Sequence, residues 1–142
     1  MSKYKCSHGD DYPDAAAKNL TDGRVLFGNA RYDGAGYHAG YVVECVLKTL
    51  LQLDNQFLCS HDLSRLSQKA LGLAGLGSSN SARYIKALPT RLPYGNPPHG
   101  WRETLRYCSE GVVDEPTATQ WLSEADRMYQ GVVSGMKKDG LI

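Results

Sequence analysis

Residues 37–54, YHAGYVVECVLKTLLQLD, decide the fold that the sequence predicts. At 100° per residue, their aliphatic side chains spread over about half of a helix circumference, which is wider than the apolar stripe of a surface helix. Such a helix has neighbours on several sides, so we expect it at the centre of a bundle. Its other face carries an ordered run of polar, aromatic and thiol side chains: Tyr37, His38, Tyr41, Glu44, Cys45, Lys48 and Gln52.

Amphipathic helices are predicted on both sides of this segment. Asp14 is the expected N-cap of the preceding helix, and Ser60 is the expected N-cap of the following one. A long final helix after Pro116 has the clearest apolar face. No alternating strand pattern occurs. The predicted fold class is therefore all-α, an antiparallel up-and-down bundle of four to five helices with a long Pro-rich loop before the final helices.

A chain of 142 residues suits a single domain. Residues 1–12 are polar and lack an apolar period, so we expect a flexible arm followed by one helical domain over residues 13–140. No run approaches the roughly 18 apolar residues of a membrane span, and the four cysteines are few and scattered. These features predict a cytoplasmic protein with reduced thiols and no membrane association.

The Pro-rich loop and its flanks are locally basic, although the whole chain is nearly neutral. Phosphates pair with guanidinium groups and bases stack on rings, so basic residues interleaved with aromatic ones are typical of single-stranded RNA or nucleotide binding. The alternative is a solvated loop with a few rings in the core. The cations are Arg83, Lys86, Arg91, Arg102 and Arg106, and the aromatic residues are Tyr84, Tyr94, Trp101 and Tyr107.

Glu44 and Lys48 lie one helical turn apart in the order that favours an ion pair, with Tyr37 and Tyr41 on the same stripe. On an exposed surface this pair contributes only a few tenths of a kcal/mol. In a cleft between helices, desolvation would require the two charges to be paired, and the stripe would suit a polar ligand. The residues alone leave both interpretations open.

Two further motifs carry weaker signals. Cys6 and His8, and likewise Cys59 and His61, repeat a Cys-x-His spacing that offers four zinc ligands, but structural zinc sites usually space paired ligands further apart. The glycines of residues 72–77 are reminiscent of a phosphate-binding loop, yet no strand precedes them and no Lys-Ser or Lys-Thr follows. We therefore expect neither a metal nor a cofactor.

The segment GYHAGYVVECVLKTLL, followed by HDLSRLSQKA, resembles the HEPN domain, a nucleotide-binding helical domain of higher eukaryotes and prokaryotes. Members commonly show an Ala- and Tyr-rich stretch, a Glu-x-x-x-Lys helix, and a His-Asp-Leu start to the next helix. The resemblance is best over residues 14–74. It implies a bundle of four or five helices that is frequently a homodimer. It also implies a nucleotidyltransferase-type partner or a role in toxin-antitoxin and phage-defence systems.

The resemblance implies that active members are metal-independent ribonucleases with an Arg-x(4–6)-His motif late in the domain. Here no His follows Arg106 or Arg127, and only Arg31 and His38 have a permitted spacing, at a different place. Cleaving RNA without a metal requires proton transfer near the 2′-hydroxyl, for which His is suited at neutral pH. The sequence therefore argues against ribonuclease activity.

We accordingly expect a non-catalytic HEPN-like protein that binds a nucleotide or RNA, or that pairs with a nucleotidyltransferase-type partner. One alternative is a HEPN ribonuclease that uses Arg31 and His38, and another is a purely structural dimerisation module. The expected ligand-binding residues are Tyr37, Tyr41, Glu44, Lys48, His61, Asp62, Arg102 and Arg106.

Overall fold

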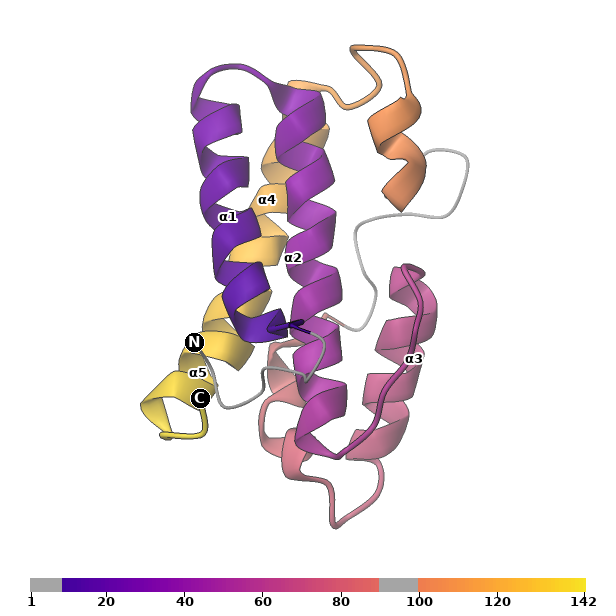
Figure 1. Ribbon diagram of the computed structural model, residues 1–142, viewed down its shortest axis with the longest axis vertical. Helices are drawn as coiled ribbons and strands as arrows, with labels where there is room; N and C mark the ends of the chain where they lie inside the picture. Colours follow the sequence, from indigo (N-terminus) through magenta and orange to yellow (C-terminus); the bar gives the residue numbers. More distant parts are fainter. Residues whose placement is uncertain (1–8, 90–99) are drawn as a thin grey trace.

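The computed structural model describes residues 9–89 and 100–142. The main helices are α1 (Tyr12–Gly28), α2 (Tyr32–Leu53), α3 (Leu63–Ala74) and α4 (Glu115–Tyr129), and α4 continues through the π-helical turn η4 (Gln130–Ser134) into α5 (Gly135–Lys138) (Figure 1). Short 3-10 helices form η1 (Asn80–Arg83), η2 (Ile85–Ala87) and η3 (Glu103–Tyr107). No strand occurs in the described ranges, and the predicted all-α bundle is confirmed. None of the described helices is long and apolar enough to cross a membrane.

α2 is the central helix, as its wide apolar face predicted. Fifteen of its residues are buried, and α1, α3 and α4 all contact it (Figure 1). The helix begins at Tyr32, and residues 29–31 connect it to α1. Asp33 lies in the first turn of α2, but its side chain does not cap the helix. Its carboxylate instead accepts hydrogen bonds at 2.7 Å from the N–H groups of Gly111 and Val113, just before α4.

The helices do not alternate in direction along the whole chain. α1 and α2 are antiparallel, whereas α3 and α4 both run in the same direction as α2 (Figure 1). Hydrogen bonds at the two ends of α3 agree with its running in the same direction as α2. His61, before α3, contacts Glu44 in the middle of α2, whereas Ser79, after α3, donates to Asp54 at the end of α2.

Two N-caps lie near the predicted residues but not at them. α1 begins inside the predicted N-terminal arm, because Asp11 and not Asp14 is the cap, and the Asp11 Oδ1 accepts from the Asp14 N–H at 3.2 Å. α3 is capped by Asp62, whose Oδ1 accepts from the Arg65 N–H at 3.0 Å. The Ser60 hydroxyl accepts from the Asp62 N–H at 3.0 Å, so it stabilises the turn that leads into the helix.

The long final helix is interrupted where it was expected to be continuous. The π-helical turn η4 separates α4 from α5 and contacts η2. A Cβ atom on Gly131 would lie 2.3 Å from the Ala87 Cβ, which is far inside van der Waals contact. The missing side chain at Gly131 therefore lets η2 approach the turn directly.

Candidate functional site

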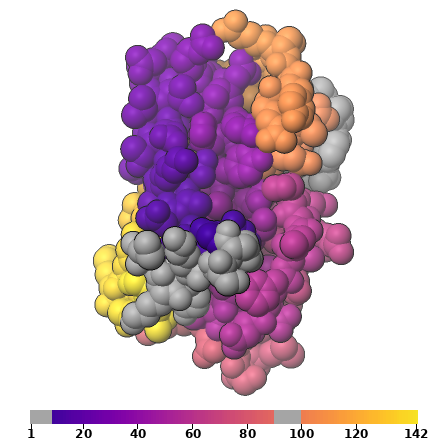
Figure 2. Space-filling view, viewed as in Figure 1, coloured from indigo at the N-terminus to yellow at the C-terminus, as the bar shows by residue number. Residues whose placement is uncertain are grey.

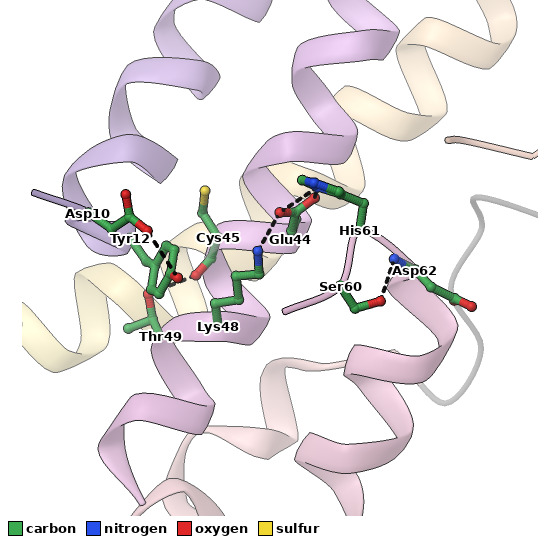
Figure 3. Close-up of polar contacts among 9 residues, drawn as sticks. All are labelled: Asp10, Tyr12, Glu44, Cys45, Lys48, Thr49, Ser60, His61 and Asp62. Carbon is green, nitrogen blue, oxygen red and sulfur yellow. Dashed lines mark hydrogen bonds and ion pairs between the residues drawn. The ribbon is translucent and has the colours of Figure 1, made fainter. Parts of the chain in front are cut away.

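Glu44 lies at the centre of the polar stripe on α2, and its side chain is only 4% exposed. Its carboxylate accepts from the Lys48 Nζ at 2.7 Å, and the His61 Nδ1 lies 2.9 and 3.1 Å from its two oxygens (Figure 3). The Lys48 side chain is itself 12% exposed. The ion pair that the spacing predicted is therefore present and buried, and its two donors offset the cost of burying the carboxylate.

His61 connects the start of α3 to the middle of α2. A carboxylate can only accept, so the His61 Nδ1 that faces Glu44 carries a proton and donates it. The opposite ring nitrogen, Nε2, has no hydrogen-bond partner within the described part of the chain, and half of the side chain (51%) is exposed. A buried carboxylate thus fixes the orientation of an imidazole whose outer edge is accessible.

Aromatic rings surround Tyr41, one helical turn before Glu44 on the stripe. Tyr41 makes edge contacts with Tyr37, Trp101 and His61, at ring-centroid distances of 5.1, 5.3 and 6.2 Å respectively. Burial is the largest cause that raises the pKa of the Tyr41 hydroxyl, followed by its hydrogen bond with Tyr37. Tyr41 therefore stays protonated at neutral pH and joins His61 to the chain segment that begins at Trp101.

Trp101 anchors the segment that carries η3. Its indole is buried, and its Nε1 donates to the Tyr37 carbonyl at 3.0 Å. A Cβ atom on Gly40 would lie 1.9 Å from the Trp101 Cε2, so only glycine leaves room for this ring against α2. Because Asp33 binds the N–H groups after η3, the segment of residues 100–113 is fixed to α2 at both ends.

η3 places Arg106 beside the tyrosines of α2. A hydrogen bond to the Tyr37 hydroxyl is the largest cause that raises the pKa of Arg106, and a hydrogen bond to Tyr107 adds to it. The guanidinium lies 4.9 Å from the centre of the Tyr107 ring, which is 75% exposed. Arg102 is exposed on the same segment, with its terminal nitrogen 3.9 Å from the Cys108 Sγ.

The structure divides the predicted basic segment. Arg83 lies at the other end of α2, where it pairs with Asp139 at 3.1 Å and lines an open cavity of about 410 Å³ that Leu53 also lines. Arg91 and Tyr94 lie outside the described residues, as do Cys6 and His8 of the zinc hypothesis. Among the described cations of the basic segment, Arg106 in η3 and Arg102 at its start lie on the part of the chain that packs against α2.

The predicted ligand-binding residues fall into two groups. Glu44 and Lys48 form a buried frame, and Asp62 is occupied as the N-cap of α3. The side chains with surface to offer are His61, Arg102 and Arg106, together with the half-buried rings of Tyr37 and Tyr41. In Figure 2 the orange segment that contains η3 and the magenta chain around α3 lie next to each other on the same side of α2.

Arg31 and His38, the candidate catalytic pair, have different partners. The Arg31 guanidinium is 3.5 Å from Glu110 on the surface, whereas the His38 Nδ1 is 2.8 Å from the Asn19 Oδ1 on α1. The Asn19 Nδ2 donates to the Ala15 carbonyl at 2.8 Å, so its Oδ1 accepts from His38 and the His38 Nδ1 carries the proton. Burial is the largest cause that lowers the pKa of His38.

His38 is expected to make the fold sensitive to acid. Because its pKa is lowered on folding, the unfolded chain binds a proton more readily near pH 6.5, and the stability due to neutral His38 is present above about pH 6.5. That stability is lost as the pH falls through the lower pKa that His38 has in the folded protein. Urea denaturation between about pH 8 and pH 5 should show a falling midpoint that is less steep in His38→Gln. Equal slopes in the two proteins would contradict this assignment.

The cysteines within the described ranges take part in no group that is placed to bind a metal. Within residues 9–89 and 100–142, no group of three or more His, Cys, Asp or Glu side chains is placed to hold a metal ion. Cys45, Cys59 and Cys108 are free thiols. Cys59 is exposed, whereas Cys45 is buried in α2, and that burial raises the pKa of its thiol to about 12.

Two features of the site were not predicted. The ring of Tyr12 lies 5.4 Å from the Lys48 Nζ, so the start of α1 covers the buried ion pair (Figure 3). The other feature is the docking of Trp101 on Gly40. Gly36 and Gly40, one turn apart, were its sequence signal, because adjacent glycines on one helix face allow close approach of another segment.

Comparison of the chain with protein-family models, with curated proteins and with solved structures found no match. The function proposed below therefore rests on the geometry of this site and on the resemblance of the motif.

Proposed function

We propose that this protein is a non-catalytic, HEPN-like helical protein that binds a nucleotide or single-stranded RNA. The binding surface, which we call the His61–Arg106 surface, consists of Tyr37, Tyr41, His61, Arg106 and Tyr107. The observation that carries the proposal is that two cationic or protonatable side chains, from η3 and from the start of α3, meet the same pair of tyrosines on α2.

The chemistry of this surface suits a phosphate next to a base. A guanidinium forms strong, charge-assisted hydrogen bonds with phosphate oxygens, and an imidazole can add a second donor. The Tyr107 ring is exposed and already stacks with the Arg106 guanidinium, which is the type of platform on which bases of single strands stack. Phosphate and base recognition are thus both available within one short segment.

The residues that carry the HEPN resemblance support the same proposal in a specific way. The Glu-x-x-x-Lys motif supplies Glu44 and Lys48, and the His-Asp-Leu motif supplies His61 and the helix cap Asp62. In our proposal Glu44, Lys48 and Asp62 build a frame. The ligand contacts the outward edge of His61, the two tyrosine rings of α2 and the neighbouring η3 side chains. The role of the frame gives a reason for the buried charges of Glu44 and Lys48, which would hold His61 in place.

Arg106→Ala is expected to weaken binding of a short oligouridylate by about 10-fold to 100-fold, since a hydrogen bond to a charged group contributes about 1.5–3 kcal/mol. Fluorescence anisotropy with a labelled oligonucleotide, and calorimetry with mononucleotides, measure the change. Arg83→Ala is the matched control, because Arg83 is also an exposed cation and lies at the other end of α2. Equal losses in both variants, or no binding by the wild type, would overturn the proposal.

The ribonuclease alternative is favoured by one observation. The hydrogen bond from the His38 Nδ1 to Asn19 leaves Nε2 as a proton acceptor, and the lowered pKa keeps that ring neutral at pH 7. This alternative predicts metal-independent cleavage of RNA that disappears in His38→Ala. A wild-type protein that binds an oligonucleotide without cutting it supports the non-catalytic proposal.

A further inference from the structure

The buried frame holds His61 in one orientation whether or not the imidazole is charged. Glu44 and Lys48 already neutralise each other at 2.7 Å, and the Nδ1–H of His61 donates to Glu44 in both protonation states. A second proton can therefore be gained only at Nε2, the outward nitrogen. Protonation changes this atom from a hydrogen-bond acceptor into a cationic donor at a fixed position.

A phosphodiester oxygen distinguishes these two states. It only accepts hydrogen bonds and carries one negative charge throughout the range in which histidines usually titrate, so it is attracted by an Nε2–H and repelled by an Nε2 lone pair. A terminal phosphate is a less suitable probe, because its own charge changes near pH 6. The side chain thus suits an internal phosphate of a single strand.

We infer that His61 is a proton-dependent phosphodiester ligand of the His61–Arg106 surface, and that Glu44 and Lys48 are positioning residues that aim its Nε2 outward. This inference rests on the proposed function and specifies its ligand as a single-stranded nucleic acid held through an internal phosphate. Arg106 supplies a charge that does not depend on pH, and His61 supplies the charge that does.

Each element around His61 contributes titratable or charged groups to its environment. They are Glu44, Lys48 and Tyr41 on α2, Cys59 and Asp62 in its own connection, Arg65 on α3, Tyr12 over Lys48 at the start of α1, and Arg106 beside Tyr37 on η3. Glu44 is the group that accepts the hydrogen bond of His61, and its charge is already balanced by Lys48.

The test is the affinity of the full-length protein for a six-nucleotide oligouridylate with a 5′-hydroxyl, measured by fluorescence anisotropy at constant ionic strength. Between about pH 5.5 and pH 8, the wild-type affinity should fall as the pH rises, by up to tenfold per pH unit if binding requires one proton. A wild-type affinity that does not change with pH overturns the inference and leaves the proposed function intact. Failure to bind at any pH overturns both.

Two substitutions of His61 distinguish the role of Nδ1, which faces Glu44, from the role of Nε2, which faces outward. His61→Asn retains an amide donor near the Nδ1 position and removes the outer nitrogen, so we expect a stable fold whose affinity no longer varies with pH. His61→Gln retains a neutral donor near Nε2 and should also bind independently of pH. His38→Gln is the control and should keep the wild-type pH dependence. If His61→Asn keeps that dependence, the inference is wrong.

Discussion

Gly40→Ala is expected to detach the segment of residues 100–113 from α2 and to lower the free energy of unfolding by about 3–5 kcal/mol, the usual cost of losing a buried tryptophan side chain. The added Cβ would lie 1.9 Å from the Trp101 Cε2, where real contacts are near 3.5–4 Å. The helix cannot move away, because Ala39 and Val43 beside it are fully buried on the core side. The indole must therefore leave.

Urea denaturation measures the loss, and tryptophan fluorescence shows where it arises. Trp101 is buried in the folded protein, so its displacement should shift the emission to longer wavelength, while Trp121 remains buried in α4. Gly72→Ala is the matched control. It replaces another helical glycine, but beyond the neighbouring backbone of its own helix no atom lies within 4 Å of the new Cβ, so we expect a gain of about 0.5–1 kcal/mol from helix propensity. A Gly40→Ala protein as stable as the wild type would contradict the packing.

The same substitution should also abolish oligonucleotide binding in our proposal. Trp101 and Asp33 hold the two ends of the segment that presents Arg106, and the indole also donates to the backbone carbonyl of Tyr37. Releasing Trp101 leaves Arg106 on a disordered segment. Ligand binding would then have to order this segment, and the loss of conformational entropy would reduce the binding free energy.

The sequence predicts the fold where the signal is local and periodic. The apolar residues of α2 recur at helical spacing, so its central position and the Glu44–Lys48 pair followed from pattern alone. The N-caps of α1 and α3 were missed by two or three residues, since several Asp and Ser residues near each start can cap and tertiary contacts choose among them. His61 must reach Glu44 before α3 begins, and this favours Asp62 over Ser60 as the cap.

Contacts between distant residues account for what the sequence could not predict. Trp101 lies about sixty positions beyond Gly40, and no local pattern shows that its ring fills the space that this glycine leaves. Similarly, Asp33 has the residue type and position of a cap but binds N–H groups almost eighty residues away. The polar residues of α2 can be read from the sequence, but their division into a buried frame and an exposed edge depends on these neighbours.

The second large effect concerns the buried frame. Lys48→Met should lower the free energy of unfolding by about 3–5 kcal/mol, because Glu44 would be left buried with only His61 as a partner. Glu44→Leu should cost a similar amount by leaving the ammonium of Lys48 buried. The matched control is Arg127→Met, which breaks a Glu–Arg pair on the more exposed side of α4 and should cost less than about 1 kcal/mol.

The double variant Glu44→Leu with Lys48→Met should be nearly as stable as the wild type, since it removes both charges together and leaves two apolar side chains of similar volume. Urea denaturation of the four proteins of this double-mutant cycle gives the coupling energy. If the double variant loses the sum of the two single losses, the residues act independently and the buried pair is not the unit that the distances indicate.

Stability and binding should separate in that double variant. His61 would lose the acceptor of its Nδ1–H, but this half-exposed ring can donate to water instead, so folding loses little. Without the hydrogen bond to Glu44, the imidazole can also rotate, and its Nε2 is then no longer held toward the ligand. We therefore expect a stable protein that binds oligouridylate more weakly and with a shallower pH dependence than the wild type. If the affinity is unchanged, the charges of Glu44 and Lys48 serve only the fold, and the His61–Arg106 surface does not depend on the frame beneath it.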